Sequence, residues 1–462
     1  MKFSQRFSIR KGIDLATYSK GIWNPTTGHW RDIVEDYLYI SRKRLSNKFS
    51  MFKLQLHILA DIIANVDGID QYKEQQRQLE SKKERKEMSE DDFNAQIEFI
   101  KSEIFAIELV NTALKEIVDG IAWRYLNYDR AILYMLANKE PVSPIRLDEG
   151  FQSDIGEFAA AFLEPAQSAI INDITNFLRV GDITIIKEDG DIELVEVKRR
   201  KKRGSRITRQ RRRMEELVEL FNTGIADYDG KKLKIVTSQV RQKNYLYKLL
   251  EAIKKARSKG YHSELVGEHI ILEVADFETM SRRDTPFEEF TQYLENKNRT
   301  IRKKWEEKDD IVIPSFLIDK INFARNYAPF SIFPFDHEIC TDILMGRIMI
   351  HVWMNYSEII RILDRHGWET IYNLFSEIKE AKEAKNEASL DKLRQKSLES
   401  FLTVRKGPIT VDLAPGKLGK LHFEFLSPKA IVGELEETLS RGPVEGYDFA
   451  LTNYLDGDRV WI

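Results

Sequence analysis

The stretch that most narrows the folds open to this chain is GDITIIKEDGDIELVEVK, residues 181–198. Its two apolar runs, 183–186 and 192–197, flank an Asp-Gly turn signal, so the stretch predicts a β-hairpin. Alternate residues of a strand share a face, and therefore Glu196 and Lys198 point the same way, about 7 Å apart at ~3.3 Å per residue. The hairpin is thus apolar along its length and charged at one end.

The length of the hairpin loop decides whether Asp182 joins this pair of charges. A two-residue turn at 189–190 would set Asp182 opposite Val197, on the other face. A three-residue loop at 189–191, with positive φ at one of its residues, would set it opposite Lys198 and on the same face. We therefore predict the three-residue loop or an equivalent bulge.

Two carboxylates beside an ammonium suit the metal-assisted hydrolysis of a phosphodiester. Carboxylate oxygens hold Mg²⁺, a hard cation that prefers oxygen ligands. The ion polarises the phosphate and lowers the pKa of a bound water. The ammonium orients that water or offsets charge in the transition state. The alternative interpretation is an ordinary hairpin with a surface ion pair.

The elements around the hairpin predict an α/β domain. Helical spacing of apolar residues is found at 154–163, 206–222 and 243–258, and strands are expected at 232–238 and 269–274. This alternation of helices and strands predicts a mixed sheet flanked by helices.

This order of elements, with Asp182 on one strand and Glu-x-Lys on the next, resembles the core of the PD-(D/E)xK nuclease superfamily over about residues 150–275. The resemblance implies a restriction-endonuclease-like fold with Asp182 and Glu196 as metal ligands and Lys198 as the catalytic lysine. It implies Mg²⁺ as the cofactor, with Mn²⁺ able to substitute. Gly181 stands where the family has its leading proline.

Many members of the superfamily add a glutamate from the preceding helix, and Glu157 is the best match for this further metal ligand. The same residue also fits a helix start, because Asp154 three residues earlier would cap the helix and Glu157 would take the acidic third position. Glu164, seven residues on, is the substitute if Glu157 faces elsewhere.

A basic run begins at the predicted catalytic lysine. Residues 198–213 hold eleven Lys or Arg and no Asp or Glu, so a chain of net charge −2 carries 61 − 74 = −13 outside them. Such a cluster favours a nucleic-acid partner and contacts to phosphates rather than bases. The family resemblance implies DNA rather than RNA as that partner. The predicted contact residues are Arg199, Arg200, Lys201, Lys202, Arg203, Arg206, Arg209, Gln210 and Arg213. A localisation signal or a solvated surface is the alternative, and for Gln210 a polar helix face.

The hairpin region lies between two others, so we predict three domains: 1–142, 143–276 and 277–462. The first reads as helical with a charged arm, because apolar helices at 51–64, at 93–118 and at 121–137 surround a polar stretch and a helix start at Ser89. The third reads as mixed α/β, with helices at 337–356, 358–384 and 428–439 and strands at 409–413 and 420–426. The helical arms, including a second at 377–400, predict a homo-oligomer or a partner subunit.

Composition narrows the class of protein further. The single Cys340 excludes an internal disulfide framework. The sequence contains no run of 18 apolar residues, so we expect no transmembrane helix. We expect a cytoplasmic, metal-dependent nuclease and, by family resemblance, a role in defence against foreign DNA. The alternative is a catalytically inactive nucleic-acid-binding or scaffold protein that reuses the nuclease fold.

Overall fold

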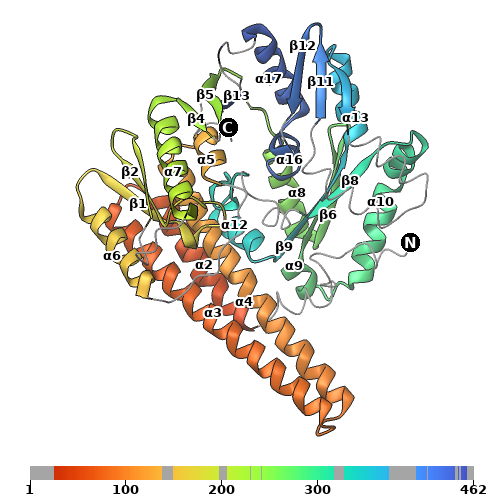
Figure 1. Ribbon diagram of the computed structural model, residues 1–462. Coiled ribbons are helices and arrows are strands. Elements are labelled where there is room, and N and C mark those ends of the chain that lie inside the picture. The colour runs from red at the N-terminus through yellow and green to blue at the C-terminus, as the bar shows by residue number, and fades with distance from the viewer. Residues whose placement is uncertain are drawn as a thin grey trace. The chain divides into compact units, whose positions relative to one another are not determined.

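The computed structural model describes residues 25–137, 149–196, 205–228, 230–240, 242–316, 327–373, 402–413, 415–442, 446 and 449–454. The chain mixes helices with several small sheets, so the coarse prediction of a mixed α and β protein is confirmed (Figure 1). The described residues form two compact units, the first from 25–235 and 329–347, the second from 236–316, 327–328 and 348–454. These units cut across the three domains that we predict.

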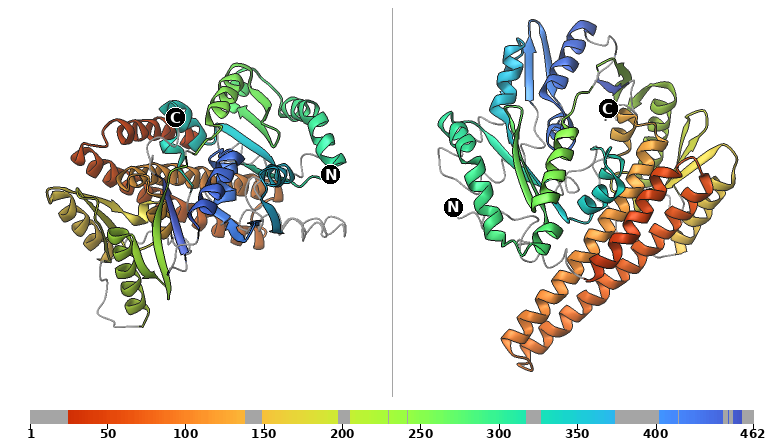
Figure 2. Two further views of the ribbon diagram at one scale, coloured as in Figure 1. Left: turned by 90° about the horizontal axis from the view of Figure 1, so that it is seen from above. Right: turned by 180° about the vertical axis from the view of Figure 1, so that it is seen from behind.

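A bundle of helices makes up the first part of unit 1. Its helices are α2 (Pro25–Lys43), α3 (Lys48–Glu84), α4 (Glu90–Tyr125), α5 (Arg130–Leu136) and, from far along the chain, α12 (His337–Leu344). Helices α3 and α4 lie side by side along their length and form a helical hairpin, which agrees with the predicted charged helical arm (Figures 1 and 2). Ser89 starts α4 as expected, since its side chain accepts a hydrogen bond from the Asp92 N–H at 3.1 Å.

The helix predicted at 121–137 is in fact two. Helix α4 continues to Tyr125, and the chain then turns through Asn127 and Tyr128, whose φ angles are 50° and 55°. Asp129 starts α5 by accepting the Ile132 N–H at 2.9 Å. This capping aspartate lies inside an apolar pattern that otherwise reads as continuous helix, which is why the sequence pattern hides the break.

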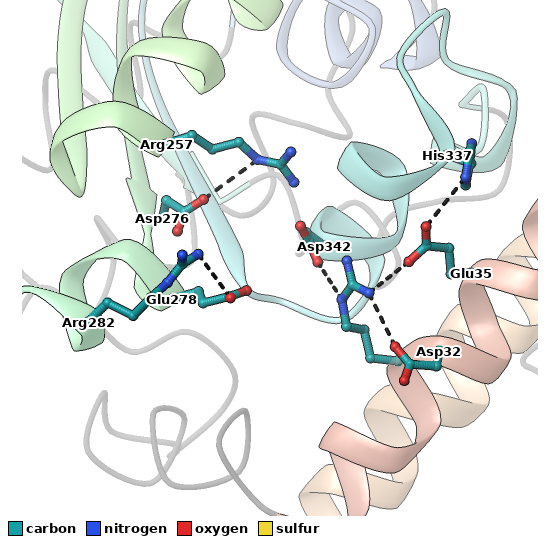
Figure 3. A network of polar contacts seen from close by, with 9 residues as sticks. Asp32, Glu35, Arg257, Asp276, Glu278, Arg282, His337 and Asp342 are labelled. Carbon is teal, nitrogen blue, oxygen red and sulfur yellow. Dashed lines mark hydrogen bonds and ion pairs between the residues drawn. The ribbon is translucent and has the colours of Figure 1, made fainter.

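The remote segment 329–347 belongs to the helical bundle of unit 1 through polar contacts. The Arg31 guanidinium donates to Asp342 at 3.1 Å, and His337 pairs with Glu35 at 3.4 Å (Figure 3). Arg42 donates to the backbone carbonyls of residues 331, 333 and 335. The segment therefore packs with residues about 300 positions earlier in the chain.

Helix α3 is long and apolar enough, by length and composition alone, to cross a membrane. The core helix of a soluble protein passes the same test. In this structure Leu54, Ile58 and Ile62 of α3 are buried, each at 3% exposure or less.

The rest of unit 1 contains the predicted hairpin. The elements are α6 (Glu149–Leu163), β1 (Gln167–Ile171), β2 (Ile183–Lys187), β3 (Ile192–Val195), α7 (Ser205–Thr223) and β4 (Ile225–Tyr228), and β5 (Lys231–Ser238) follows. Strands β1, β2 and β3 form an antiparallel sheet in that order, and β4 pairs with β5. The sheet around the hairpin is therefore antiparallel within the described residues, whereas we predict a mixed one.

Unit 2 is built on a four-stranded antiparallel sheet in the order β6-β7-β9-β8. Its elements are α8 (Leu246–Lys259), β6 (Tyr261–Val266), β7 (Ile270–Asp276), α9 (Phe277–Arg282), α10 (Phe287–Glu307), β8 (Val312–Phe316), β9 (Ile348–Asn355), α13 (Tyr356–Arg365), β10 (Glu369–Asn373), β11 (Leu402–Lys406), β12 (Ile409–Leu413), α16 (Pro415–Phe423), α17 (Pro428–Arg441) and β13 (Phe449–Tyr454). Strands β10, β11 and β12 form a second antiparallel sheet.

Two predictions for the C-terminal region are wrong. The helix predicted at 337–356 ends at Leu344, and after Gly346, whose φ is 69°, residues 348–355 form the central strand β9. In the segment predicted as a strand at 420–426, residues 420–423 are instead the end of helix α16, and 424–426 follow it outside any named strand. Both segments are short apolar runs, in which helical and extended spacing cannot be told apart. The helix predicted at 358–384 ends at Arg365, and the arm predicted at 377–400 lies outside the described residues.

Candidate functional site

The loop of the β2–β3 hairpin has the predicted odd length but lies one residue earlier in the chain. Lys187 donates to the Asp191 carbonyl at 2.9 Å, so the loop consists of residues 188–190 rather than 189–191. Gly190 takes a φ of 91°, and the Asp189 side chain accepts the Asp191 N–H at 3.1 Å. The register that follows pairs Ile183 with Val195, and the predicted pairing of Asp182 with Lys198 is therefore wrong.

The end of the hairpin away from the loop brings Asp182 next to Glu196. The Asp182 N–H donates to the Val195 carbonyl at 2.8 Å, and that carbonyl belongs to the peptide that links Val195 to Glu196. Because Ile183 also faces Val195, two successive residues of one strand meet one residue of the other, as in a β-bulge. Asp182 is half-buried and Glu196 is exposed.

A buried asparagine fixes the backbone that leads into Asp182. The Asn172 amide donates to the carbonyls of Val180 and Gly181, at 3.0 Å each, and its oxygen accepts the Thr184 hydroxyl at 2.9 Å. The Asn172 N–H also donates to the Asp182 carbonyl at 2.9 Å. Asn172 is 2% exposed, so these bonds are shielded from water. The main chain of Asp182 is consequently bonded on both sides.

Gly181 is required by the geometry at this position. Its φ is 76°, and a Cβ atom there would lie 2.9 Å from the Val195 carbonyl oxygen and 3.4 Å from the Met214 Cε. Proline, which the PD-(D/E)xK superfamily has at the corresponding place of its motif, has φ fixed near −65° and could not adopt this conformation. The backbone at Gly181 therefore differs from one that a proline could take.

Helix α7 runs along the hairpin, with its N-terminal end toward Asp182 and Glu196. Near its C-terminus, Asn222 accepts the Ile192 N–H at 3.2 Å, at the loop end of β3. Met214, two turns earlier, packs near Gly181 at the opposite end of the strand. The first two turns of α7 therefore lie toward Asp182 and Glu196.

The structure describes only part of the predicted nucleic-acid contact set. Arg206, Arg209 and Gln210 lie on the first turns of α7, and nothing is described of their side chains. Arg213 is half-buried, and its neighbour Arg212 pairs with Glu216 at 2.7 Å. Lys198 and the residues Arg199, Arg200, Lys201, Lys202 and Arg203 lie outside the described residues.

The structure places the remaining predicted metal ligand, Glu157, on the exposed side of helix α6. Its predicted substitute Glu164 is exposed just beyond the end of the same helix. In the part of the chain that the structure describes, no group of three His, Cys, Asp or Glu side chains is gathered so as to hold a metal ion. The described candidate site is therefore the pair Asp182 and Glu196.

Sequence analysis did not identify Asp119, a buried aspartate that binds the loop leading to Asp182. Asp119 of α4 accepts the Asn176 backbone N–H at 2.8 Å and the Asn176 side-chain amide at 2.9 Å, which holds the loop between β1 and β2. Burial, and then the nearby Glu116 carboxylate, raise the pKa of Asp119 to about 7. The signal was available, since an aspartate inside the apolar run IVDGIAW is unusual without a buried partner.

A second buried carboxylate organises unit 2. Glu273 on β7 is fully buried and accepts hydrogen bonds from His351 and Trp353 of β9, each at 2.8 Å, and from Asn298 and Arg302 of α10. Burial favours the neutral acid, but the bond from His351 and the charge of Arg302 outweigh it and lower the pKa of Glu273. Each oxygen has two donors, so this network joins sheet to helix.

Comparison of the chain with protein-family models, with curated proteins and with solved structures finds no match. The resemblance to the PD-(D/E)xK superfamily therefore rests on the residues of the hairpin and on the order of the elements around it.

Proposed function

We propose that this protein is a metal-dependent nuclease that hydrolyses phosphodiester bonds of nucleic acid, with DNA as the favoured substrate. The observation that carries the proposal is the adjacency of Asp182 and Glu196 at the open end of the hairpin. Gly181 and Asn172 hold the backbone of Asp182 there, and the basic end of α7 lies toward the same place.

In this proposal the two carboxylates hold Mg²⁺ or Mn²⁺, and the ion would supply an activated water and a Lewis acid for the phosphate. Lys198, two residues beyond Glu196, would orient the attacking water or offset the charge that develops on the phosphate. The Arg and Lys residues that follow would bind the backbone phosphates without reading the bases. Glu157 would contribute only if α6 approached the pair when metal binds.

The order of the helices and strands gives the proposal weaker support than the Asp182 and Glu196 pair does. The order α6, β2, β3, α7, β5 follows the order of the superfamily core, and strands β1 and β4 lie between these elements. We place the activity in the cytoplasm and, by the resemblance alone, in defence against foreign DNA. Assembly through the helical arms is part of the same proposal.

Plasmid cleavage tests the proposed function. We expect the purified full chain to cut supercoiled plasmid with Mg²⁺ or Mn²⁺ and to lose this activity in EDTA. Asp182→Asn, Glu196→Gln and Lys198→Ala should each lower the rate on the order of 10³-fold, since each removes several kcal/mol of transition-state stabilisation.

Glu193→Gln is the matched control, because Glu193 is an exposed carboxylate on the same strand, three residues before Glu196, and pairs only loosely with Lys187 at 3.7 Å. It should cleave at the wild-type rate. Cleavage that survives both Asp182→Asn and Lys198→Ala would contradict the proposed site. Salt-dependent binding of DNA without cleavage in either metal would favour the inactive binding protein instead.

A further inference from the structure

The chain has a second basic segment besides residues 198–213. Residues 231–259 contain ten Lys or Arg and a single acidic residue, Glu251. Together with the eleven charges of 198–213, this leaves 51 − 73 = −22 on the remainder of the chain. Positive charge is therefore concentrated in two places, and the second of them includes helix α8 of unit 2.

Helix α8 turns a basic face to solvent. Its apolar residues Leu249, Ile253 and Ala256 are fully buried and pack toward β6 and β7. Lys254 and Lys255 lie on the opposite, exposed side, one turn after Glu251 and two turns after Tyr247, whose ring is 58% exposed. The helix is thus amphipathic, with lysines and an exposed aromatic ring outside.

Several of these cations are already paired with carboxylates. Lys255 pairs with Glu264 at 2.8 Å, and Arg257 with Asp276 at 3.7 Å (Figure 3). Lys254 and Lys259 are both exposed, and neither forms an ion pair with an acidic side chain in the part of the chain that the structure describes. The surface therefore retains positive charge after its internal pairs are made.

An arginine just after helix α9 extends this surface. The Arg283 guanidinium donates to the carbonyl of Ser258, in the last turn of α8, at 2.8 Å, so it lies beside Lys259. Its neighbour Arg282 pairs with Glu278 at 3.0 Å (Figure 3). Cations in the last turn of a helix are favoured by the helix dipole, which accounts for Lys259. The dipole does not account for Lys254, which precedes the last turn of α8, or for Arg283, which follows α9.

We propose that the exposed surface around the C-terminal half of α8, formed by Lys254, Lys259 and Arg283, binds the sugar-phosphate backbone of a nucleic-acid duplex as a second contact. Lysine and arginine side chains without carboxylate partners bind phosphates by charge and by hydrogen bonds, with no base recognition. A membrane surface fits less well, because an interfacial helix inserts its apolar face and that of α8 is buried against the sheet. The choice of nucleic acid as partner rests on the proposed function, but the binding does not require cleavage.

The test measures duplex binding by the full chain carrying Asp182→Asn, in EDTA, by fluorescence anisotropy over a range of salt. The variant Lys254→Gln/Lys259→Gln/Arg283→Gln should bind at least about tenfold more weakly near 0.1 M salt. Its slope of log affinity against log salt should shrink by up to about 2.7, since each phosphate contact contributes about 0.9. The control Lys82→Gln/Lys101→Gln/Lys308→Gln removes three exposed charges elsewhere and should change neither quantity.

Equal binding by the two triple variants would overturn the proposal for α8 and leave the nuclease proposal standing. Absence of any duplex binding by the parent protein would overturn it as well. Loss of binding to phosphatidylserine vesicles, with duplex binding intact, would assign the surface to membranes instead. Thermal unfolding of each variant checks that the helix remains folded. Plasmid cleavage by the protein that keeps Asp182 tests the nuclease proposal separately.

Discussion

At the scale of single residues, the candidate site depends on neighbours that carry no chemistry themselves. Asn172 binds the two carbonyls before Asp182, and Gly181 lets the chain approach the Val195 carbonyl closely. The motif residues could be read from the sequence because their types and spacing are distinctive. Asn172 could not, because its role depends on hydrogen bonds to residues eight to twelve positions away.

Replacement of Gly181 tests this close approach. Gly181→Ala should destabilise the protein by about 1–2 kcal/mol for the left-handed conformation and by at least about 1 kcal/mol more for the contact with the Val195 carbonyl. Gly190→Ala is the matched control, because Gly190 also has positive φ but nothing within 4 Å of a new Cβ atom. Denaturant unfolding compares the two, and an equal loss in both variants would refute the close approach.

A buried histidine makes stability depend on pH. His422 of α16 lies between the Ser315 hydroxyl at 2.9 Å and the Tyr356 hydroxyl at 2.8 Å, and burial lowers its pKa to about 3. Below pH ~6.5 the unfolded chain takes up a proton that the folded chain does not. The free energy of unfolding should therefore fall by up to about 1.4 kcal/mol per pH unit as the pH drops from about 6.5 toward 3.

The measurement is a set of urea unfolding curves between pH 4 and 7 for the wild type and for His422→Gln. The variant should be less stable at pH 7, because its hydrogen bonds are disturbed, but should lose less stability on acidification. Parallel pH profiles for the two proteins would show that His422 is not the group responsible.

At the scale of elements, spacing and caps predicted the long helices and the hairpin well. The helix start at Ser89, the strands at 183–187 and 192–195, and the basic helix over 205–223 all follow from local patterns. Strand β1 was missed because its five residues, QSAII, show no alternation. Strand β9 was predicted as helix because a buried central strand is apolar on both faces and loses its period of two.

The hairpin shows how a correct element can still have the wrong register. We predict the odd loop length because it sets Asp182 on the same face as Glu196 and Lys198; the structure has such a loop one residue earlier, where the Asp189 side chain accepts the Asp191 N–H. That shift takes Asp182 away from a place opposite Lys198 and brings it beside Glu196. Sequence patterns predict the register of a hairpin poorly, because the register can depend on one hydrogen bond in the loop, worth about 1 kcal/mol.

At the scale of the whole molecule, the sequence predicted the mixture of helix and sheet, and it carries no signal for the pairings between distant segments. Segment 329–347 packs with helices of the N-terminal bundle, and β7 pairs with β9 more than 70 residues later. Long-range pairings of this kind leave no local signal, since each strand reads the same whichever partner it has. A net charge of −2 likewise conceals two basic segments on a remainder of −22.

The most direct test of the account is calorimetric titration of the full chain with Mn²⁺, since the central claim is that Asp182 and Glu196 together hold a divalent ion. The wild type and the control Glu193→Gln should bind Mn²⁺ alike. Asp182→Asn and Glu196→Gln should each weaken the binding at least about tenfold, because a hard cation loses a charged oxygen ligand. Mn²⁺ affinity that is unchanged in both variants would contradict the claim.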